Sequence, residues 1–280
     1  LAAAHHQALH IRRHTAALLG LSAVKAAQEG RYQTEQGVEV PIKEAVESAI
    51  RARVSIPPEA QLPDPPSPRF PATRMEVANE TTFGAAQRLI GLGLRPLALN
   101  FANGIHPGGG FLRGARAQEE VLCRSSALYL TLLNDPMYEA HLRRPRPDST
   151  DWAILSPQVP VFRHDDGTNL DQPWLLDFIT CAAPVATHIG QPESGDLLEA
   201  RIHRVLAIAR AHGYTALVLG AWGCGAFGND PRRTAEDFRV ALEGPFDGAF
   251  SDVVFAITDW SPKRKTLGPF RDVFSPDAAG

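Results

Sequence analysis

The chain has 280 residues, a length that fits one large domain or two small ones. Hydrophobic residues make up 44% and charged residues 21%, which are ordinary values for a globular protein. The net charge of −3 excludes a protein that binds nucleic acid through an overall basic surface, so a polyanionic ligand would need a local site.

The sequence predicts a cytoplasmic protein that makes no membrane contact. Its apolar runs are all shorter than the ~18 residues that cross a bilayer, and its first residues do not follow a signal-peptide pattern. Its three cysteines, Cys123, Cys181 and Cys224, are widely spaced and odd in number. They therefore fit neither a zinc-site spacing nor a disulfide framework, and a reducing compartment is the simplest setting.

Residues 1–70 are predicted to form an N-terminal accessory region. An Ala-rich helix is expected over residues 1–30, then a weak strand over 37–43 and a helix over 44–53. His6, His10 and His14 would share one face of the first helix, but isolated surface histidines explain them more simply than a metal site. A proline-rich connector follows, and proline opposes both helices and central strands. The boundary is therefore placed here, before a second region of residues 71–280.

Strands and helices alternate from Thr73 onwards, a pattern that predicts a three-layer α/β sandwich. The continuous apolar run at 215–219 is typical of a strand that is covered on both faces. Pro160 predicts an edge position for its strand, because proline has no N–H to donate. The expected strands are 74–78, 97–100, 152–155, 159–162, 175–182, 215–219 and 252–257, and the expected helices are 81–92, 118–133, 193–212 and 231–242.

A glycine triplet and an acidic cluster follow the strand at 97–100. Gly108, Gly109 and Gly110 are consecutive, and seven residues separate them from Gln118-Glu119-Glu120 at the start of a predicted helix. Glycines let backbone approach a ligand closely and leave N–H groups unshielded. A surface loop, or an acidic helix start that offsets the helix dipole, would explain either half alone. The combination is the stronger signal.

A second glycine loop, residues 223–228, lies between a strand and a helix and has the G-x-G-x-x-G spacing of dinucleotide sites. A dehydrogenase is disfavoured, because only one strand follows and Glu243 lies at a helix end. The loop would still suit a diphosphate, since glycine N–H groups and the helix start at Asp230 carry partial positive charge. Cys224 could act as a nucleophile only with a histidine partner, and none is near it in sequence.

Together the two motifs resemble poly(ADP-ribose) glycohydrolases, of the bacterial type. The resemblance rests on Asn103, the glycine triplet, Gln118-Glu119-Glu120 and the loop 222–229, and it covers about residues 70–260. It implies a macrodomain-like α/β/α sandwich with a mixed sheet, on which an N-terminal helical extension packs. The expected ligands are poly(ADP-ribose) and ADP-ribose, with ADP-ribosylated proteins carrying the polymer. No cofactor, metal, membrane or direct DNA binding is expected.

Two adjacent glutamates at a helix start point roughly 100° apart, so they cannot easily flank one glycosidic bond as acid and nucleophile. By the resemblance, Glu120 protonates the leaving ribose oxygen of a ribose–ribose bond, mainly at chain ends, and then activates water. Glu119 would also belong to the catalytic pair and would hold the terminal ribose together with Asn103. The other substrate-binding residues implied are Gly108, Gly109, Gly110, Gln118, Gly223, Cys224, Gly225, Ala226, Phe227 and Gly228.

Three questions stay open at the level of sequence. Phe227 is either folded into the core or, as the resemblance implies, packed against the terminal ribose. A macrodomain that binds ADP-ribose without cleaving it would share Asn103 and both glycine loops but would not need Gln118-Glu119-Glu120. An acid near neutral pH also needs a raised pKa, and for Glu120 burial favours this whereas the helix N-terminus opposes it.

Overall fold

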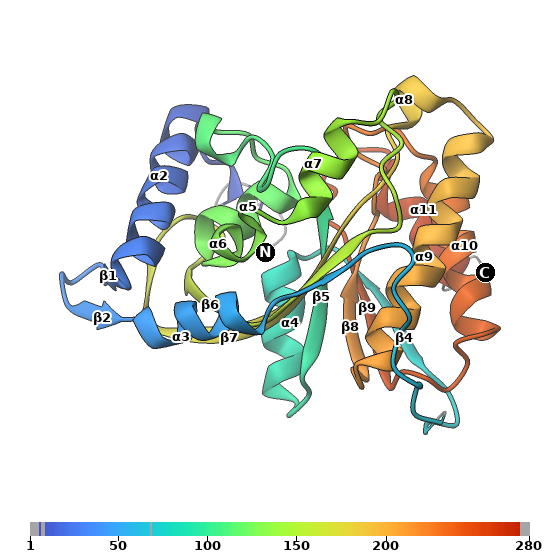
Figure 1. The fold of residues 1–280 in the computed structure, drawn as a ribbon, viewed down its shortest axis with the longest axis horizontal. Helices are drawn as coiled ribbons and strands as arrows, with labels where there is room; N and C mark the ends of the chain where they lie inside the picture. The colour runs from blue at the N-terminus through green and yellow to red at the C-terminus, as the bar shows by residue number, and fades with distance from the viewer. Residues whose placement is uncertain (1–5, 7–8, 68, 275–280) are drawn as a thin grey trace. The chain divides into compact units, whose positions relative to one another are not determined.

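The computed structural model describes residues 6, 9–67 and 69–274 (Figure 1). Its larger sheet is mixed, has seven strands in the order β3-β6-β7-β5-β8-β9-β4 and is flanked by helices. The chain divides into two compact units: unit 1 from residues 1–56, 100–142 and 154–180, and unit 2 from residues 57–99, 143–153 and 181–280. The boundary between 1–70 and 71–280 stays a prediction.

Unit 1 contains the glycine triplet and the acidic cluster Gln118-Glu119-Glu120. Its elements, some of which continue into unit 2, are α2 (Arg13–Glu29), β1 (Arg31–Gln33), β2 (Glu39–Pro41), α3 (Lys43–Ala52), β3 (Val54–Ile56), the end of β5 (Pro96–Ala102), η1 (Phe111–Arg113), α5 (Gln118–Ser125), α6 (Leu128–Leu132), α7 (Pro136–Leu142), β6 (Ala153–Arg163) and β7 (Asn169–Ala182).

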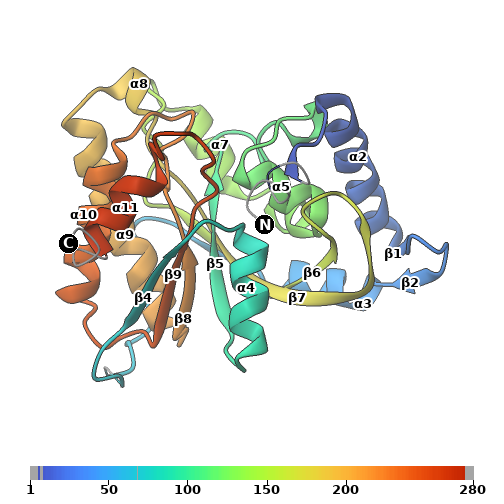
Figure 2. The ribbon, with the colours of Figure 1, turned by 180° about the vertical axis from the view of Figure 1, so that it is seen from behind.

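Helix α2 lies against α5 and η1, as both ribbon views show (Figures 1 and 2). Its buried face carries only alanine and glycine, and a Cβ on Gly20 would lie 2.8 Å from the carbonyl oxygen of Phe111. A Cβ on Gly114 would in turn collide with the backbone of Arg13. Because Gly20 and Gly114 have no side chain, α2 can pack closely against the segment that carries the glycine triplet.

Unit 2 contains the second glycine loop, between β8 and α10. Strands β5, β8, β9 and β4 are parallel, with Leu97 opposite Leu217, Leu217 opposite Val253 and Met75 opposite Val253. Its other elements are β4 (Arg74–Ala78), α4 (Thr82–Gly91), α8 (Ala186–Ile189), α9 (Glu193–Ala211), β8 (Ala216–Leu219), α10 (Pro231–Glu243), β9 (Asp252–Ala256) and α11 (Leu267–Phe274).

The proline-rich connector is held on α9 by arginines. Arg204 donates 3.0 Å hydrogen bonds to the carbonyl oxygens of Pro57 and Ala60, and Arg210 bonds Pro66. Proline lacks an N–H but keeps its carbonyl acceptor. The guanidinium groups on α9 therefore satisfy the carbonyl acceptors of a segment that cannot join a sheet.

Several predicted elements differ from the structure. The helix predicted over residues 1–30 is interrupted: His6 and Leu9 are helical, residues 10–12 are not, and α2 begins at Arg13. The part of the prediction on residues 1–5 and 7–8 lies outside the described residues. The predicted helix 118–133 is two helices, since Ser126 is extended (φ −146°) and bridges Val161. The edge position predicted from Pro160 is wrong: β6 lies between β3 and β7, and the Pro160 carbonyl accepts from the N–H of Ala127.

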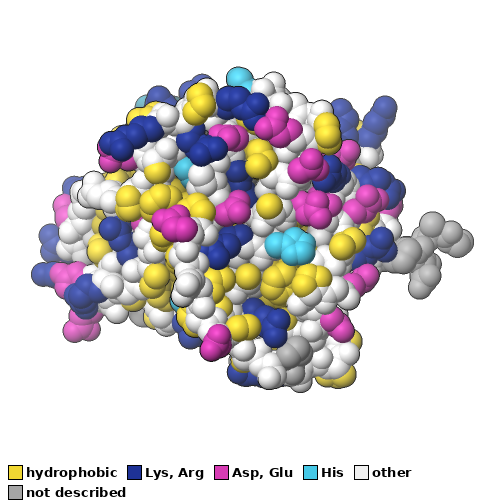
Figure 3. Space-filling model, turned by 45° about the vertical axis from the view of Figure 1, so that its right-hand side comes forward, with side chains coloured by type: hydrophobic (Ala, Val, Ile, Leu, Met, Phe, Trp, Pro, Cys, Tyr) yellow, Lys and Arg dark blue, Asp and Glu magenta, His cyan; other side chains and the backbone are white. Residues whose placement is uncertain are grey.

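The surface shown in Figure 3 intersperses basic and acidic side chains. This agrees with the small net charge of −3, so binding of a polyanion depends on local donors. In the portion of the chain that the structure describes, no helix combines the length and apolar character required to cross a bilayer.

Candidate active site

The acidic cluster lies at the start of α5 in unit 1, and both glutamates are buried. Glu119 and Glu120 are only 3% and 8% exposed. The N–H of Asn103 donates a 2.7 Å hydrogen bond to Oε2 of Glu119, and Nδ2 of Asn100 donates to its Oε1 at 3.3 Å. Gln118 accepts from the N–H of Phe101 at 2.9 Å. The end of β5 thus fixes the first turn of α5.

Glu120 differs from Glu119 in having one oxygen without a partner. The N–H of Gly110 donates a 2.9 Å hydrogen bond to Oε1 of Glu120. Its Oε2 is buried and has no hydrogen-bond partner among the described residues. Both oxygens of Glu119 are engaged, so Glu120 has the carboxylate oxygen that is available to a ligand.

The glycine triplet passes directly over the two carboxylates. Gly108 and Gly109 have φ values of 70° and 57°, in the left-handed region that favours glycine. A Cβ on Gly109 would collide with Oε1 of Glu120 and lie 3.1 Å from Oε2 of Glu119. The glycines therefore let the backbone close over the acidic pair.

Burial raises the pKa of Glu119 to about 8. The N–H of Asn103 opposes this shift by stabilising the carboxylate, whereas the charge of Glu120 adds to it. Burial also raises the pKa of Cys123 and of Tyr138 well above their ordinary values, and the charge of Glu119 contributes to both shifts. Glu119 therefore retains its proton near neutral pH, in surroundings that disfavour further negative charge.

Asn103 uses its side-chain oxygen locally. Its Oδ1 accepts hydrogen bonds from the N–H groups of Ile105 and His106, at 3.0 and 2.9 Å. This turn directs the chain from β5 into the glycine triplet. Among the polar groups of the Asn103 side chain, the amide Nδ2 is left to donate to a ligand. A ribose hydroxyl could accept this hydrogen bond.

In unit 2 the second glycine loop is closed by Asn229, which is 3% exposed. Its Nδ2 donates to the carbonyl oxygens of Pro184 (2.9 Å) and Gly223 (3.2 Å), and its Oδ1 accepts from Oγ of Ser194 at 2.7 Å. Gly223 and Gly228 have φ values of 75° and 74°. Sequence reasoning gave Asn229 no role, although its place at the end of a glycine loop is a signal that could have indicated one.

The loop presents backbone donors outward. Within the described chain, the N–H groups of Gly225, Ala226 and Phe227 have no hydrogen-bond partner in the protein. Successive free N–H groups form a concavity that suits an anion. The expected contribution of the α10 N-terminus is weaker, because the carboxylate of Asp230 already accepts from Arg232 N–H at 2.8 Å and from Arg233 N–H at 3.4 Å.

Cys224 and Phe227 were ambiguous in sequence. Burial raises the pKa of the Cys224 thiol to about 12, and its Sγ lies 3.5 Å from both the carbonyl oxygen of Trp222 and Oγ1 of Thr234. The thiol is therefore neutral and unsuited to nucleophilic attack. The Phe227 side chain is half-buried and lies outside the fully buried core.

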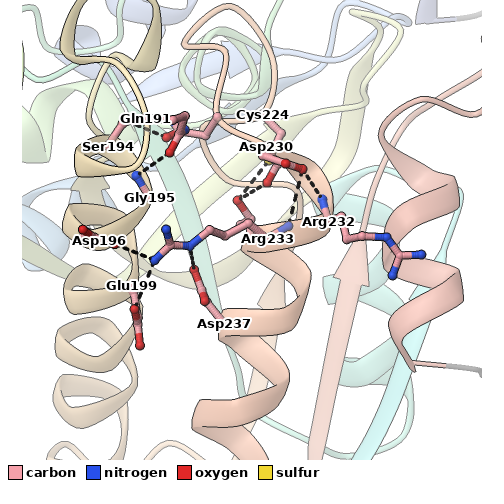
Figure 4. A network of polar contacts seen from close by, with 12 residues as sticks. Gln191, Ser194, Gly195, Asp196, Glu199, Cys224, Asp230, Arg232, Arg233 and Asp237 are labelled. Atoms are coloured by element: carbon pink, nitrogen blue, oxygen red, sulfur yellow. Dashed lines mark hydrogen bonds and ion pairs between the residues drawn. The ribbon is translucent and has the colours of Figure 1, made fainter.

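Arg233 ties α10 to α9 next to this loop (Figure 4). Its guanidinium donates to Asp196 at 2.8 Å and Glu199 at 3.4 Å on α9, and its Nε lies 3.4 Å from Asp237 on its own helix. A Cβ on Gly195 would lie 2.7 Å from this guanidinium, so a larger residue there would displace the end of the Arg233 side chain. The helix that follows the loop is thereby fixed at its first turn.

Comparison with known families decides the assignment. Residues 21–164, more than half of the chain, match the model of the family described as microbial-type PARG, catalytic domain. The chain belongs to this family. PARG denotes poly(ADP-ribose) glycohydrolase. The predicted family, the macrodomain-like α/β fold and the hydrolase class are confirmed, whereas the roles of individual site residues stay predictions.

Solved structures agree with this PARG assignment. The PARG from Thermomonospora curvata is 42% identical, covers 93% of this chain and 100% of its own, and superposes with a TM-score of 0.85. A complex of the Deinococcus radiodurans PARG with ADP-ribose is 40% identical, covers 90% and 97%, and has a TM-score of 0.70. None of the curated proteins that were compared matches the chain.

Proposed function

We propose that this PARG family member hydrolyses ribose–ribose O-glycosidic bonds of poly(ADP-ribose) and releases ADP-ribose, mainly from chain ends. One observation carries the proposal: a buried acidic pair in which Glu120 alone keeps a free oxygen. The T. curvata relative has been solved with the inhibitor ADP-HPD and the D. radiodurans relative with ADP-ribose. The same class of ligand is proposed for this chain.

Glu120 is the proposed general acid and base. Its Oε2 would protonate the leaving ribose oxygen and then take a proton from the attacking water. The Gly110 hydrogen bond to Oε1 holds the carboxyl so that Oε2 is the atom presented.

Glu119 is proposed to position the substrate. Its hydrogen bonds to Asn103 and Asn100 fix the carboxyl group, and its raised pKa of about 8 keeps it largely neutral at pH 7. A neutral carboxyl can both donate to and accept from a ribose hydroxyl. The free Nδ2 of Asn103 would add a second donor to that sugar.

The unit 2 loop is the proposed diphosphate site. Its three free N–H groups, on residues 225–227, supply donors that need no lysine or arginine. The half-buried ring of Phe227 would pack on the terminal ribose region. The polymer would be carried by ADP-ribosylated proteins, and the three free cysteines support a cytoplasmic location.

The test is incubation of the purified protein with poly(ADP-ribose), followed by mass analysis of the products. ADP-ribose is expected to accumulate from the start, without intermediate oligomers, if chain ends are attacked. Early oligomers would contradict the chain-end proposal and leave hydrolysis intact. If the protein binds ADP-ribose but releases none from the polymer, the hydrolase proposal is wrong and the protein is a non-catalytic macrodomain that binds ADP-ribose.

A further inference from the structure

Arg201 is a buried arginine of α9, in unit 2, to which the proposed mechanism gives no role. Its residue is 1% exposed. Its Nη1 donates a 3.0 Å hydrogen bond to the carbonyl oxygen of Ala182, and its Nη2 donates to that of Asp148. Its Nε lies 3.5 Å from Oδ1 of Asp151, so the buried charge has an ion-pair partner. One guanidinium group therefore joins α9 to the end of β7 and to the loop that precedes β6.

The two backbone segments that Arg201 bonds are also joined directly to each other. The chain leaves β7 after Ala182, and Pro184 has no N–H with which to continue the strand. The N–H of Val185 then donates a 3.0 Å hydrogen bond to the carbonyl oxygen of Pro147. Arg201 thus closes a ring of contacts around the end of β7.

Residues 182–187, which we call the supporting segment, lie against the second glycine loop. Near the start of the segment, Nδ2 of Asn229 donates a 2.9 Å hydrogen bond to the carbonyl oxygen of Pro184. Near its end, the N–H of Thr187 donates to the carbonyl oxygen of Phe227 at 3.4 Å. The supporting segment therefore bonds two separate parts of the loop that is the proposed diphosphate site.

The glycine loop and the supporting segment are packed tightly at both points. A Cβ on Gly223 would lie 2.8 Å from Cβ of Ala183. A Cβ on Gly228 would likewise lie 2.8 Å from Cγ2 of Thr187. Closely packed groups transmit a displacement to their neighbours. A shift of the supporting segment should therefore move the backbone of the loop.

We propose that Arg201 is a positioning residue for the diphosphate site. By bonding Ala182 and Asp148 it fixes the supporting segment, and this segment fixes the loop so that the N–H groups of residues 225–227 stay directed at one anion. Donors that are held in place before the ligand arrives lose little freedom when it binds. The inference rests on the proposed diphosphate role of the loop.

The test compares R201Q and R201K with wild type in affinity for ADP-ribose, by calorimetry, and in the kcat and KM of polymer hydrolysis. Lysine keeps the charge but not the planar fork that reaches two carbonyl groups, and glutamine keeps neither. R201Q should raise Kd by ~10-fold, the loss expected for one charge-assisted hydrogen bond, and R201K should raise it less. KM should rise with Kd while kcat stays within a few-fold, because Glu120 belongs to unit 1.

R204Q is the matched control, because Arg204 also lies on α9 and also bonds two backbone carbonyl oxygens, those of Pro57 and Ala60. These carbonyl groups belong to the proline-rich connector and not to the supporting segment. R204Q should therefore lower the melting temperature and leave the Kd of ADP-ribose unchanged. Equal rises in Kd for R201Q and R204Q would overturn the inference.

The double variant R201K/N229A tests whether Arg201 acts through the supporting segment. Arg201 bonds the segment at Ala182 and Asn229 bonds it at Pro184, so the double variant should bind ADP-ribose little more weakly than the weaker single variant. Additive losses overturn the inference, as does unchanged affinity in folded R201Q or, if R201Q does not fold, in R201K. Weak binding by N229A alone overturns it and leaves the diphosphate site standing. Unchanged affinity in N229A overturns the proposed diphosphate site and this inference together.

Discussion

Gly110 and Glu120 are joined by a 2.9 Å hydrogen bond from the backbone N–H of the glycine to Oε1 of the carboxylate. The glycine triplet therefore has a task besides letting a ligand approach. It orients the carboxylate and leaves Oε2 free. Substitutions in the loop should act on catalysis through the position of Glu120.

Gly109→Ala should lower turnover by ~10²-fold or more, since removal of a positioned acid or base costs that much. The added Cβ would displace Oε1 of Glu120. Gly37→Ala is the control: Gly37 has a similar φ of 79° but nothing within 4 Å of the added Cβ. Both variants should lose ~1–2 kcal/mol of stability from the left-handed backbone. Equal turnover in the two would contradict the positioning role.

Glu120→Gln should lower turnover by ~10²–10⁴-fold while affinity for ADP-ribose stays within a few-fold, because glutamine keeps the shape but cannot exchange the proton. Glu119→Gln should raise Kd as well as lower turnover, since this side chain is proposed to hold the ribose. Calorimetry with ADP-ribose and timed product release measure the two effects. Wild-type turnover by Glu120→Gln would end its assignment as acid and base.

Stability should depend on pH through Glu119. Folding raises the pKa of this carboxyl to about 8, so the folded state binds the proton more tightly than the unfolded state. The resulting contribution is present below the unfolded pKa of ~4.3 and is lost as pH rises to about 8. The melting temperature of Glu119→Gln minus that of wild type should therefore increase across this window. A constant difference would show that Glu119 has no raised pKa.

Asn229→Ala should weaken ADP-ribose binding and lower the free energy of unfolding by ~1–3 kcal/mol, because the carbonyl oxygen of Pro184 loses its side-chain donor and that of Gly223 keeps only the backbone N–H of residue 229. Ser194→Ala removes only the bond to Oδ1 of Asn229 and should have a smaller effect on affinity. Chemical denaturation and calorimetry give both quantities. If Asn229→Ala binds ADP-ribose with unchanged affinity, the loop does not contribute to ligand binding.

Phe227→Ala should lower turnover and affinity for ADP-ribose with little change in melting temperature, because the ring is half-buried in the free protein. Truncation of a fully buried Phe costs ~3–5 kcal/mol. Phe238, which is fully buried, is the matched comparison, and Phe238→Ala should lose that stability. A comparable loss in Phe227→Ala would place its ring in the core and contradict its proposed contact with substrate.

The strands of unit 2 were the most predictable part of the fold. The apolar runs that become β8 and β9 are fully buried, so hydrophobic pattern alone decides their state. Ser126 shows why prediction failed between α5 and α6. Its extended backbone pairs with Val161, a residue far along the chain, so no local pattern could indicate that the helix ends there. Helices α7, α8 and α11 have only 7, 4 and 8 residues, so few positions carry a helical pattern.

For the site, the sequence motifs located the acidic pair and both glycine loops but not their supports. Asn100 ends an apolar strand, and only the fold shows that its amide contacts Glu119 and Thr180. Arg201 lies in a helix in which any arginine would pass for a surface residue. The division of labour between Glu119 and Glu120 also depends on which backbone N–H groups approach each oxygen. That geometry is set by tertiary contacts and has no signature in residue spacing.

The contact between Gly20 and Phe111 constrains how the N-terminal helix can change in evolution. Because a Cβ at position 20 would lie 2.8 Å from the Phe111 carbonyl oxygen, the two segments cannot drift independently. A relative with a larger residue at position 20 must also shift the backbone at 111, next to the glycine triplet. A chimeric protein that takes this helix from a relative with a larger residue at position 20 would therefore keep activity only if it also takes the segment around residue 111 from that relative.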